Sequence, residues 1–248
     1  MKITFLGTGT SQGVPLIACT CEVCTSEDPR DKRLRTSILV ECEGISIVVD
    51  TGPDFRQQML REKVKKLDAV VFTHEHKDHI AGLDDIRAFN FILKRKIDVY
   101  ASDRVQDAIR REFAYIFSDT KYPGIPEIEL HTIHNKPFEI KGIPIIPIEV
   151  LHYKLSVFAF RFGDFVYITD ANAISQQEKK KIVGCKILVI NALRRQAHVS
   201  HFTLQEALDL IAELKPEKAY LTHISHQLGK HSNIEKELPS GVFQAYDG

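Results

Sequence analysis

The chain has 248 residues, 44% of them hydrophobic and 27% charged, and its 33 Lys and Arg residues balance 33 Asp and Glu residues. This composition suits one α/β domain with a sizeable core, and the zero formal net charge excludes a global electrostatic attraction to nucleic acid or to an anionic membrane. No stretch approaches the run of about 18 apolar residues that a membrane span needs, and the N-terminal residues lack the apolar run of a secretion signal. We therefore expect a single cytoplasmic domain over residues 1–248, without a membrane partner.

Short runs rich in β-branched residues recur along the chain and predict strands. They cover residues 2–6, 37–41, 45–49, 68–72, 145–150, 157–162, 165–169, 187–190 and 218–222. Helical patterns fall between some of them, at residues 54–63, 83–93, 103–117, 175–181 and 204–214. The segment Thr203-Leu204-Gln205-Glu206 fits a capping box and predicts the start of the last helix. We expect an α/β fold of sheets flanked by helices, because neighbouring strands and helices mix throughout.

The predicted strand at residues 68–72 runs directly into Thr73-His74-Glu75-His76-Lys77-Asp78-His79. Three imidazoles and a carboxylate fall within six residues here, at the point where the chain leaves an apolar strand. His74 and His76 are spaced to reach one cation, while Asp78 and His79 on the next turn can face a second one. Nitrogen and carboxylate donors suit Zn²⁺, with Mn²⁺ or Fe²⁺ as alternatives. A solvated histidine-rich loop is the other interpretation, and four potential ligands beside a buried strand disfavour it.

The pattern His74-x-His76-x-Asp78-His79 resembles the signature of the metallo-β-lactamase superfamily. Later strand ends supply further donors in the order that this superfamily shows. The resemblance implies an αββα sandwich, in which two mixed β-sheets are flanked by helices. It also implies two catalytic divalent cations, Zn²⁺ or Mn²⁺, with open positions for water. One would be held by His74, His76 and His152 and the other by Asp78, His79 and His223, with Asp170 bridging the two.

A narrower resemblance begins with GTGTSQGVP at residues 7–15, followed by Cys19-x-Cys21-x-x-Cys24, Asp28-Pro29-Arg30 and Arg33-x-Arg35-x-Ser37. These motifs are similar to those of the branch typified by phosphoribosyl 1,2-cyclic phosphate phosphodiesterase. Members of that branch carry a separate structural zinc. The resemblance implies that Cys19, Cys21, Cys24 and His226 hold this ion in a Cys3His site. Five cysteines in a reducing compartment favour a metal cluster over a disulfide framework, and a loop of reduced cysteines is the alternative.

The expected reaction needs no serine or cysteine nucleophile, because two neighbouring cations can bind a bridging hydroxide and clamp the oxygens of a phosphodiester. The leaving oxygen still needs a proton. His201-Phe202-Thr203 resembles the His-x-Thr motif of transfer-RNA 3′-processing enzymes of the same superfamily. This implies that His201 is a general acid or orients the phosphate, with His198 as a second candidate. An exposed histidine at a helix start is the alternative for His201. Asp50 matches a superfamily aspartate that supports a metal-binding histidine.

Other polar residues carry weaker expectations. Arg194 and Arg195 could bind a substrate phosphate, although a solvated pair of loop residues is equally consistent with the sequence. Three further histidines are expected on the surface: His131, His134 and His231.

A transfer-RNA 3′ endonuclease is the nearest competing enzyme. Such enzymes place a long basic arm between the motifs that match His152 and Asp170, where this chain has only residues 153–169. Without that arm, and with zero net charge, a nucleic-acid substrate is not expected. A small, linear or cyclic phosphodiester is favoured as the substrate. Two other classes of function are alternatives: a β-lactamase, thioesterase or lactonase-type hydrolase, and a non-catalytic metal-stabilised scaffold. The sequence does not determine the oligomeric state, and a homodimer is one possibility.

Overall fold

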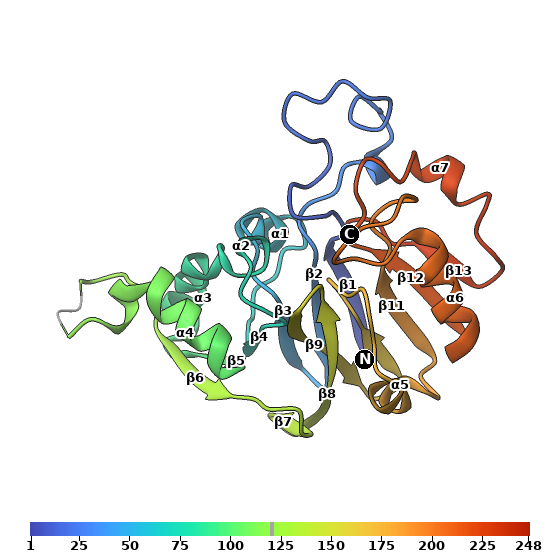
Figure 1. The fold of residues 1–248 in the computed structure, drawn as a ribbon. Coiled ribbons are helices and arrows are strands. Elements are labelled where there is room, and N and C mark those ends of the chain that lie inside the picture. Colours follow the sequence, from blue (N-terminus) through green and yellow to red (C-terminus); the bar gives the residue numbers. More distant parts are fainter. Residues whose placement is uncertain (120–121) are drawn as a thin grey trace. The chain divides into compact units, whose positions relative to one another are not determined.

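A computed structural model describes residues 1–119 and 122–248. The chain forms two compact units, each with its own β-sheet (Figure 1). Unit 1 comprises residues 1–6, 37–134 and 248, and unit 2 comprises residues 7–36 and 135–247. The expectation of one domain over the whole chain stays a prediction, because a domain can contain more than one compact unit.

The sheet of unit 1 has six strands in chain order. The second and third form an antiparallel hairpin, and the third to the sixth run parallel to one another. Parallel neighbours bring their carboxyl ends to the same edge of the sheet, which is where α/β proteins place ligands. The strands are β1 (Lys2–Gly7), β2 (Ser37–Cys42), β3 (Ile45–Val49), β4 (Ala69–Val71), β5 (Ile97–Ala101) and β6 (Ile128–Thr132).

The helices of unit 1 pack their apolar faces on this sheet. Phe55, Phe89 and Ile109 come from three different helices and join one buried cluster with Val48 and Val70 of the strands. The helical elements of unit 1 are α1 (Phe55–Arg61), α2 (Lys77–Ile80), η2 (Leu83–Ile86), α3 (Arg87–Leu93), α4 (Asp103–Glu112) and η3 (Ala114–Phe117).

The sheet of unit 2 has seven strands in the order β13-β12-β11-β10-β9-β8-β7. Strands β10 to β13 are parallel, whereas β7 to β10 are antiparallel, so this sheet is mixed like the first one. Its members are β7 (Phe138–Ile140), β8 (Ile143–His152), β9 (Leu155–Phe162), β10 (Phe165–Tyr167), β11 (Ile187–Asn191), β12 (Lys218–Thr222) and β13 (Val242–Gln244).

The predicted capping box is confirmed at the start of the longest helix of unit 2. Glu206 donates its backbone N–H to Thr203 Oγ1 at 3.2 Å, and Thr203 donates its own N–H to Glu206 Oε2 at 2.8 Å. These reciprocal bonds satisfy backbone donors that a helix start otherwise leaves unpaired. The helical elements of unit 2 are η1 (Pro29–Asp31), α5 (Gln176–Ile182), α6 (Leu204–Leu214) and α7 (His231–Ile234).

The α/β class with two mixed sheets is confirmed, and four strands were missed from the sequence. β5 and β6 alternate apolar with polar residues, as half-buried strands do, and therefore lack the run of β-branched residues that predicts the other strands. β7 and β13 have three residues each and are too short to show a period. Among the residues that the structure describes, no helix is long and apolar enough to cross a bilayer.

Candidate metal centres

The expected donors of unit 1 follow two parallel neighbours, β3 and β4. Asp50 comes directly after β3, and His74 lies just beyond the end of β4. Asp50 adopts a left-handed backbone conformation with φ of 65°. Aspartate tolerates this conformation better than most residues, and such local strain is concentrated at functional sites.

The buried Asp50 carboxylate organises the segment after β4. Its Oδ1 accepts the backbone N–H of Thr73 at 2.8 Å, and its Oδ2 accepts the Thr73 hydroxyl at 2.8 Å. His79 Nδ1 lies 2.7 Å from Asp50 Oδ2. Burial raises the pKa of the Asp50 carboxyl above its ordinary value, while the nearby His79 and the Thr73 bonds act in the opposite direction. A carboxylate on one ring nitrogen of a histidine directs the other nitrogen toward a metal.

The four donors expected from the histidine motif lie together in unit 1. The ring of His74 lies 4.6 Å from that of His76 and 4.1 Å from that of His79. Asp78 Oδ2 is 3.3 Å from His79 Nε2. Glu75, inside the same motif, forms an ion pair with Arg104 of α4 at 2.6 Å. The three imidazoles and Asp78 of the motif therefore lie together, whereas the Glu75 carboxylate is paired with the Arg104 guanidinium.

Unit 2 contributes a second set of donors at strand ends. His152 is the last residue of β8, while Asp170 and His223 follow β10 and β12 in left-handed conformations, with φ of 54° and 53°. Asp170 Oδ1 lies 3.0 Å from His223 Nδ1. The chain after Asp170 is held by Asn191 at the end of β11, whose buried carboxamide accepts the N–H of Ala171 and donates to its carbonyl, both at 3.0 Å.

His201 lies within this second set. Its Nε2 is 3.3 Å from Asp170 Oδ2, its ring stacks on His223 at 4.8 Å, and it meets the ring of His152 edge-on at 4.7 Å. Donor atoms of His152, Asp170 and His201 all lie within 4.8 Å of one another. The sequence was interpreted with His201 as a proton donor, and its position also allows it to bind a cation.

The loop between β11 and α6 presents His201 together with His198. His201 Nδ1 lies 3.2 Å from His198 Nδ1, and the hydroxyl of Ser200 lies 3.3 Å and 3.1 Å from Nδ1 of His198 and of His201. Burial, followed by the charge of His201, lowers the pKa of His198. The carbonyl oxygen of Ser200 also accepts a hydrogen bond from His152 Nδ1 at 2.9 Å. With its proton on Nδ1, His152 has the lone pair of Nε2 available to bind a metal ion.

Arg194 is hydrogen-bonded within its own loop and to the segment after β12. Its guanidinium donates to the carbonyls of Gln196 and Ala197 at 3.2 Å and 2.9 Å and to Gln227 Oε1 at 2.9 Å. Arg195 forms an exposed ion pair with Glu237 at 2.6 Å. The sequence allows phosphate binding or a solvated loop pair, and the exposed Arg195 fits the second interpretation. The hydrogen bonds of Arg194 indicate a structural role that the sequence does not predict.

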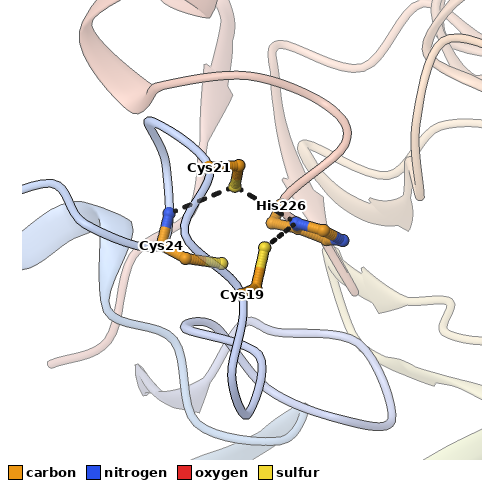
Figure 2. A group of neighbouring side chains, drawn as sticks. All are labelled: Cys19, Cys21, Cys24 and His226. Atoms are coloured by element: carbon orange, nitrogen blue, oxygen red, sulfur yellow. Dashed lines mark hydrogen bonds between the residues drawn. The ribbon is translucent and has the colours of Figure 1, made fainter.

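The three clustered cysteines of the N-terminal loop meet His226 (Figure 2). His226 Nδ1 lies 3.4 Å from Cys19 Sγ and 3.3 Å from Cys21 Sγ, and the four donor atoms all lie within 4.8 Å of one another. A tetrahedral zinc with bonds of about 2.3 Å to sulfur and about 2.0 Å to nitrogen separates such donors by about 3.5 Å. The donor set therefore fits zinc in both chemistry and spacing.

The protonation of these thiols differs. The backbone N–H of Cys24, and then His226, lower the pKa of Cys21 to about 6 and so favour its thiolate form. Burial raises the pKa of Cys24 to about 11. Zinc binds thiolates, so metal binding to the cluster releases protons and depends on pH.

Arg33, which follows the cysteine loop, is a buried structural residue that the sequence does not predict. Arg33 is 4% exposed and donates to Thr8 Oγ1 at 2.8 Å and to Gln244 Oε1 at 2.9 Å. It also lies 3.2 Å from His231 Nδ1. The expectation of a surface His231 is wrong, because this side chain is 2% exposed and packs against the guanidinium. The sequence feature that could have indicated a special role for Arg33 is its place in the Arg33-x-Arg35-x-Ser37 motif.

The seven expected catalytic ligands are divided between the units. Unit 1 supplies four donors that lie together, and unit 2 supplies three that lie together with His201. The assignment of particular ligands to particular ions stays a prediction, as does the role of His201. The ligands are His74, His76, Asp78 and His79 in unit 1 and His152, Asp170 and His223 in unit 2.

Comparison with known proteins places these motifs in a family. A family model described as a beta-lactamase superfamily domain matches residues 46–224. The crystal structure of a diphosphatase from the PhnP family is 39% identical, with a TM-score of 0.93 over 99% of this chain and 95% of that one. An octanoyltransferase from Porphyromonas gingivalis is 39% identical over 251 aligned positions, and the alignment covers 100% of this chain and 51% of that protein. A ribonuclease Z from Nostoc is 27% identical over 168 aligned positions, and the alignment covers 66% of this chain and 47% of that protein.

The chain therefore belongs to the metallo-β-lactamase superfamily and, within it, to the PhnP-like branch. The resemblance that the His-x-His-x-Asp-His motif and the cysteine loop indicated is confirmed. The chain spans about half the length of these two curated relatives, at 51% and 47%.

Proposed function

We propose that this chain is a metal-dependent phosphodiesterase that hydrolyses a small linear or cyclic phosphodiester. The observation that carries the proposal is the cluster around Asp170, whose two carboxylate oxygens lie 3.0 Å from His223 and 3.3 Å from His201. A hydrolase function is supported by the PhnP-family diphosphatase, which is 39% identical over nearly the whole chain.

We propose that two divalent cations, Zn²⁺ or Mn²⁺, take part in the reaction, bound by the donors that the two units supply. Imidazole and carboxylate donors suit these cations. Such ions, when bound, neutralise phosphate charge and lower the pKa of water. The protein's own residues orient the donors: Asp50 holds His79, and the carbonyl of Ser200 holds His152.

His201 is the residue we assign to the leaving oxygen. Its Nε2 lies among the donors of unit 2, and its Nδ1 is backed by His198 and Ser200. An imidazole in this position can hold a proton at Nε2 and pass it to a departing alkoxide. His198 is separated from Asp170 by His201 in this chain of contacts, so we assign the donor role to His201.

We further propose that Cys19, Cys21, Cys24 and His226 hold a structural zinc. The S···N distances of 3.4 Å and 3.3 Å match the spacing of a tetrahedral ion. The site joins the N-terminal loop to the segment that follows β12 and carries both His223 and His226. Zinc at this position stabilises the fold and takes no part in the reaction.

The test combines metal analysis with a substrate panel. The metal-loaded protein is assayed on bis(4-nitrophenyl) phosphate, a five-membered cyclic phosphate, a diphosphate diester, a precursor transfer RNA and an octanoyl thioester. The last two probe the activities of the ribonuclease Z and octanoyltransferase relatives. Cleavage of small diesters supports the proposal, and cleavage of the RNA or the thioester alone overturns it.

A matched pair of variants connects the activity to the cluster. Asp170→Asn removes the carboxylate, and Asp164→Asn changes an exposed aspartate on the same unit that pairs with Lys186 at 2.7 Å. We expect Asp170→Asn to lose bound catalytic metal and activity while its fold persists, and Asp164→Asn to keep both. Equal behaviour of the two variants would contradict the assignment.

A further inference from the structure

The carboxamide of Asn172 joins two segments that carry donors. Its Oδ1 accepts the backbone N–H of Tyr153 at 2.7 Å, and its Nδ2 donates to the carbonyl of Val199 at 3.3 Å. Its own backbone N–H donates to the carbonyl of Leu151 at 2.8 Å. One residue thus contacts the turn after β8 and the loop before α6, which are far apart in sequence.

Each of these segments bears a proposed functional residue. Tyr153 directly follows His152 and adopts a left-handed conformation with φ of 58°. This conformation is costly for a bulky side chain, and it needs support from its surroundings. Val199 lies in the loop between His198 and His201, and Asn172 itself stands two residues after Asp170.

We propose that Asn172 is a positioning residue that holds the His152 turn and the His201 loop in the register at which both imidazoles meet Asp170. The inference rests on the proposed phosphodiesterase function. The loop needs such a contact, because Val199 is 71% exposed and exposed loop backbone opens readily. Arg194 secures the start of this loop, and Asn172 binds it at Val199. The residues on either side of His201 are bound separately, because the Ser200 carbonyl accepts from His152 at 2.9 Å and the Phe202 N–H donates to the Ala171 carbonyl at 2.8 Å.

The chemistry of the contact requires a carboxamide. Tyr153 presents an N–H and Val199 presents a carbonyl oxygen, so the bridging side chain must accept at one end and donate at the other. Asparagine provides both functions on one planar group. Aspartate, of the same size, keeps the acceptor for Tyr153 and places a second acceptor against the Val199 carbonyl. Asn172→Asp therefore breaks the loop contact and leaves the turn contact in place.

The test compares Asn172→Asp with wild-type protein, with His201→Ala as the benchmark and with Asn233→Asp, an exposed asparagine of α7, as the matched control. Aryl methyl phosphates with 4-nitrophenolate and phenolate leaving groups are the substrates, because a misplaced proton donor matters most for the poorer leaving group. We expect Asn172→Asp to lower kcat for the phenyl ester by about tenfold or more, with a much smaller loss for the nitrophenyl ester. KM, bound metal and Tm are expected to stay at wild-type values.

Hydrogen exchange gives a readout that does not depend on turnover. In Asn172→Asp, the amides of residues 199–202 are expected to exchange faster than in wild-type protein, while the amide of Tyr153 keeps its protection. Unchanged exchange in the loop overturns the inference, whether or not the substrate is known.

The failure of the inference differs from the failure of the proposed function. If His201→Ala shows the leaving-group dependence and Asn172→Asp loses equal activity on both esters, the positioning role is wrong and the phosphodiesterase stands. If the metal-loaded wild-type protein cleaves neither ester nor any other diester, the proposed function fails, and the positioning role in that reaction fails with it.

Discussion

The Asp50 carboxylate lies 2.7 Å from Nδ1 of His79, and both side chains are buried within unit 1. The same carboxylate also accepts two hydrogen bonds from Thr73, just before His74. One carboxylate therefore fixes the ring of His79 and the start of the histidine motif. Loss of its charge disturbs several donors of unit 1 at once.

We expect Asp50→Asn to weaken metal binding and activity by about 10- to 100-fold, because the amide cannot stabilise the same histidine tautomer. Metal content after dialysis and kcat/KM at fixed metal concentration measure the effect. Asp98→Asn is the control, since Asp98 also lies 2.8 Å from a histidine, His131, in unit 1 but outside the cluster. The same loss in both variants would contradict the special role of Asp50.

Mutations in the structural and the catalytic metal centre are expected to have different effects. Cys21→Ser removes a thiolate from the Cys3His cluster, so it should lower Tm and remove one equivalent of zinc while part of the activity remains. His76→Ala should remove catalytic metal and activity with little change in Tm. Zinc analysis, thermal unfolding and turnover are measured on the same samples.

Cys42→Ser provides the control for this pair, because Cys42 is a half-buried thiol at the end of β2. It should retain both metals and activity. If Cys21→Ser and His76→Ala lose the same metal and the same activity, the division into structural and catalytic centres is wrong.

Arg194→Lys is expected to reduce kcat/KM, because a lysine cannot reproduce the three hydrogen bonds of the guanidinium fork, two within the His201 loop and one to Gln227 after β12. Arg195→Lys is the control, because it makes the same substitution at the neighbouring residue, which has no hydrogen bonds within the loop in the contacts described above. Its ion pair with Glu237 is exposed, so its loss should cost almost nothing. A larger effect at Arg195 than at Arg194 would show that phosphate binding by the exposed arginine matters more than the loop contact.

Because His231 is buried beside Arg33, we expect the stability of the fold to fall at acidic pH. Burial, and then the charges of Arg33 and Arg30, lower the pKa of His231 below its ordinary value of 6.5, while Glu235 and Asp28 act in the opposite direction. The unfolded chain therefore binds a proton at this site more readily than the folded chain does. This contribution to stability is complete above pH 6.5 and is lost as the pH falls below that value.

His231→Gln should flatten this part of the pH dependence, since glutamine does not titrate. The free energy of unfolding is measured from about pH 7.5 down to about pH 5.5 for both proteins, and the two slopes are compared. His134→Gln, at an exposed position, serves as the control and should keep the wild-type slope. A variant slope as steep as that of wild type would assign the acid sensitivity to other groups.

Much of the fold could be predicted because its signals are local. The capping box at Thr203 depends on residues three apart, and the strands before Asp50 and His74 are short runs rich in apolar residues. The half-buried strands β5 and β6 were missed because alternation over five residues is a weak signal. The cysteine loop and the histidine motif were readable because metal ligands concentrate particular residue types at short spacings.

The sequence by itself determined which donors this protein has, their order along the chain and the family to which they belong. The tertiary structure alone decided which polar side chains support the backbone beside those donors and which are buried together: Asn191 bonds Ala171, Asn172 bonds Tyr153 and Val199, and Arg33 packs against His231. These partners are 19 to 198 residues apart, and their polar side chains carry no periodic signal. They meet only when strands pair in a particular order and loops close over them, which depends on the packing of the whole unit.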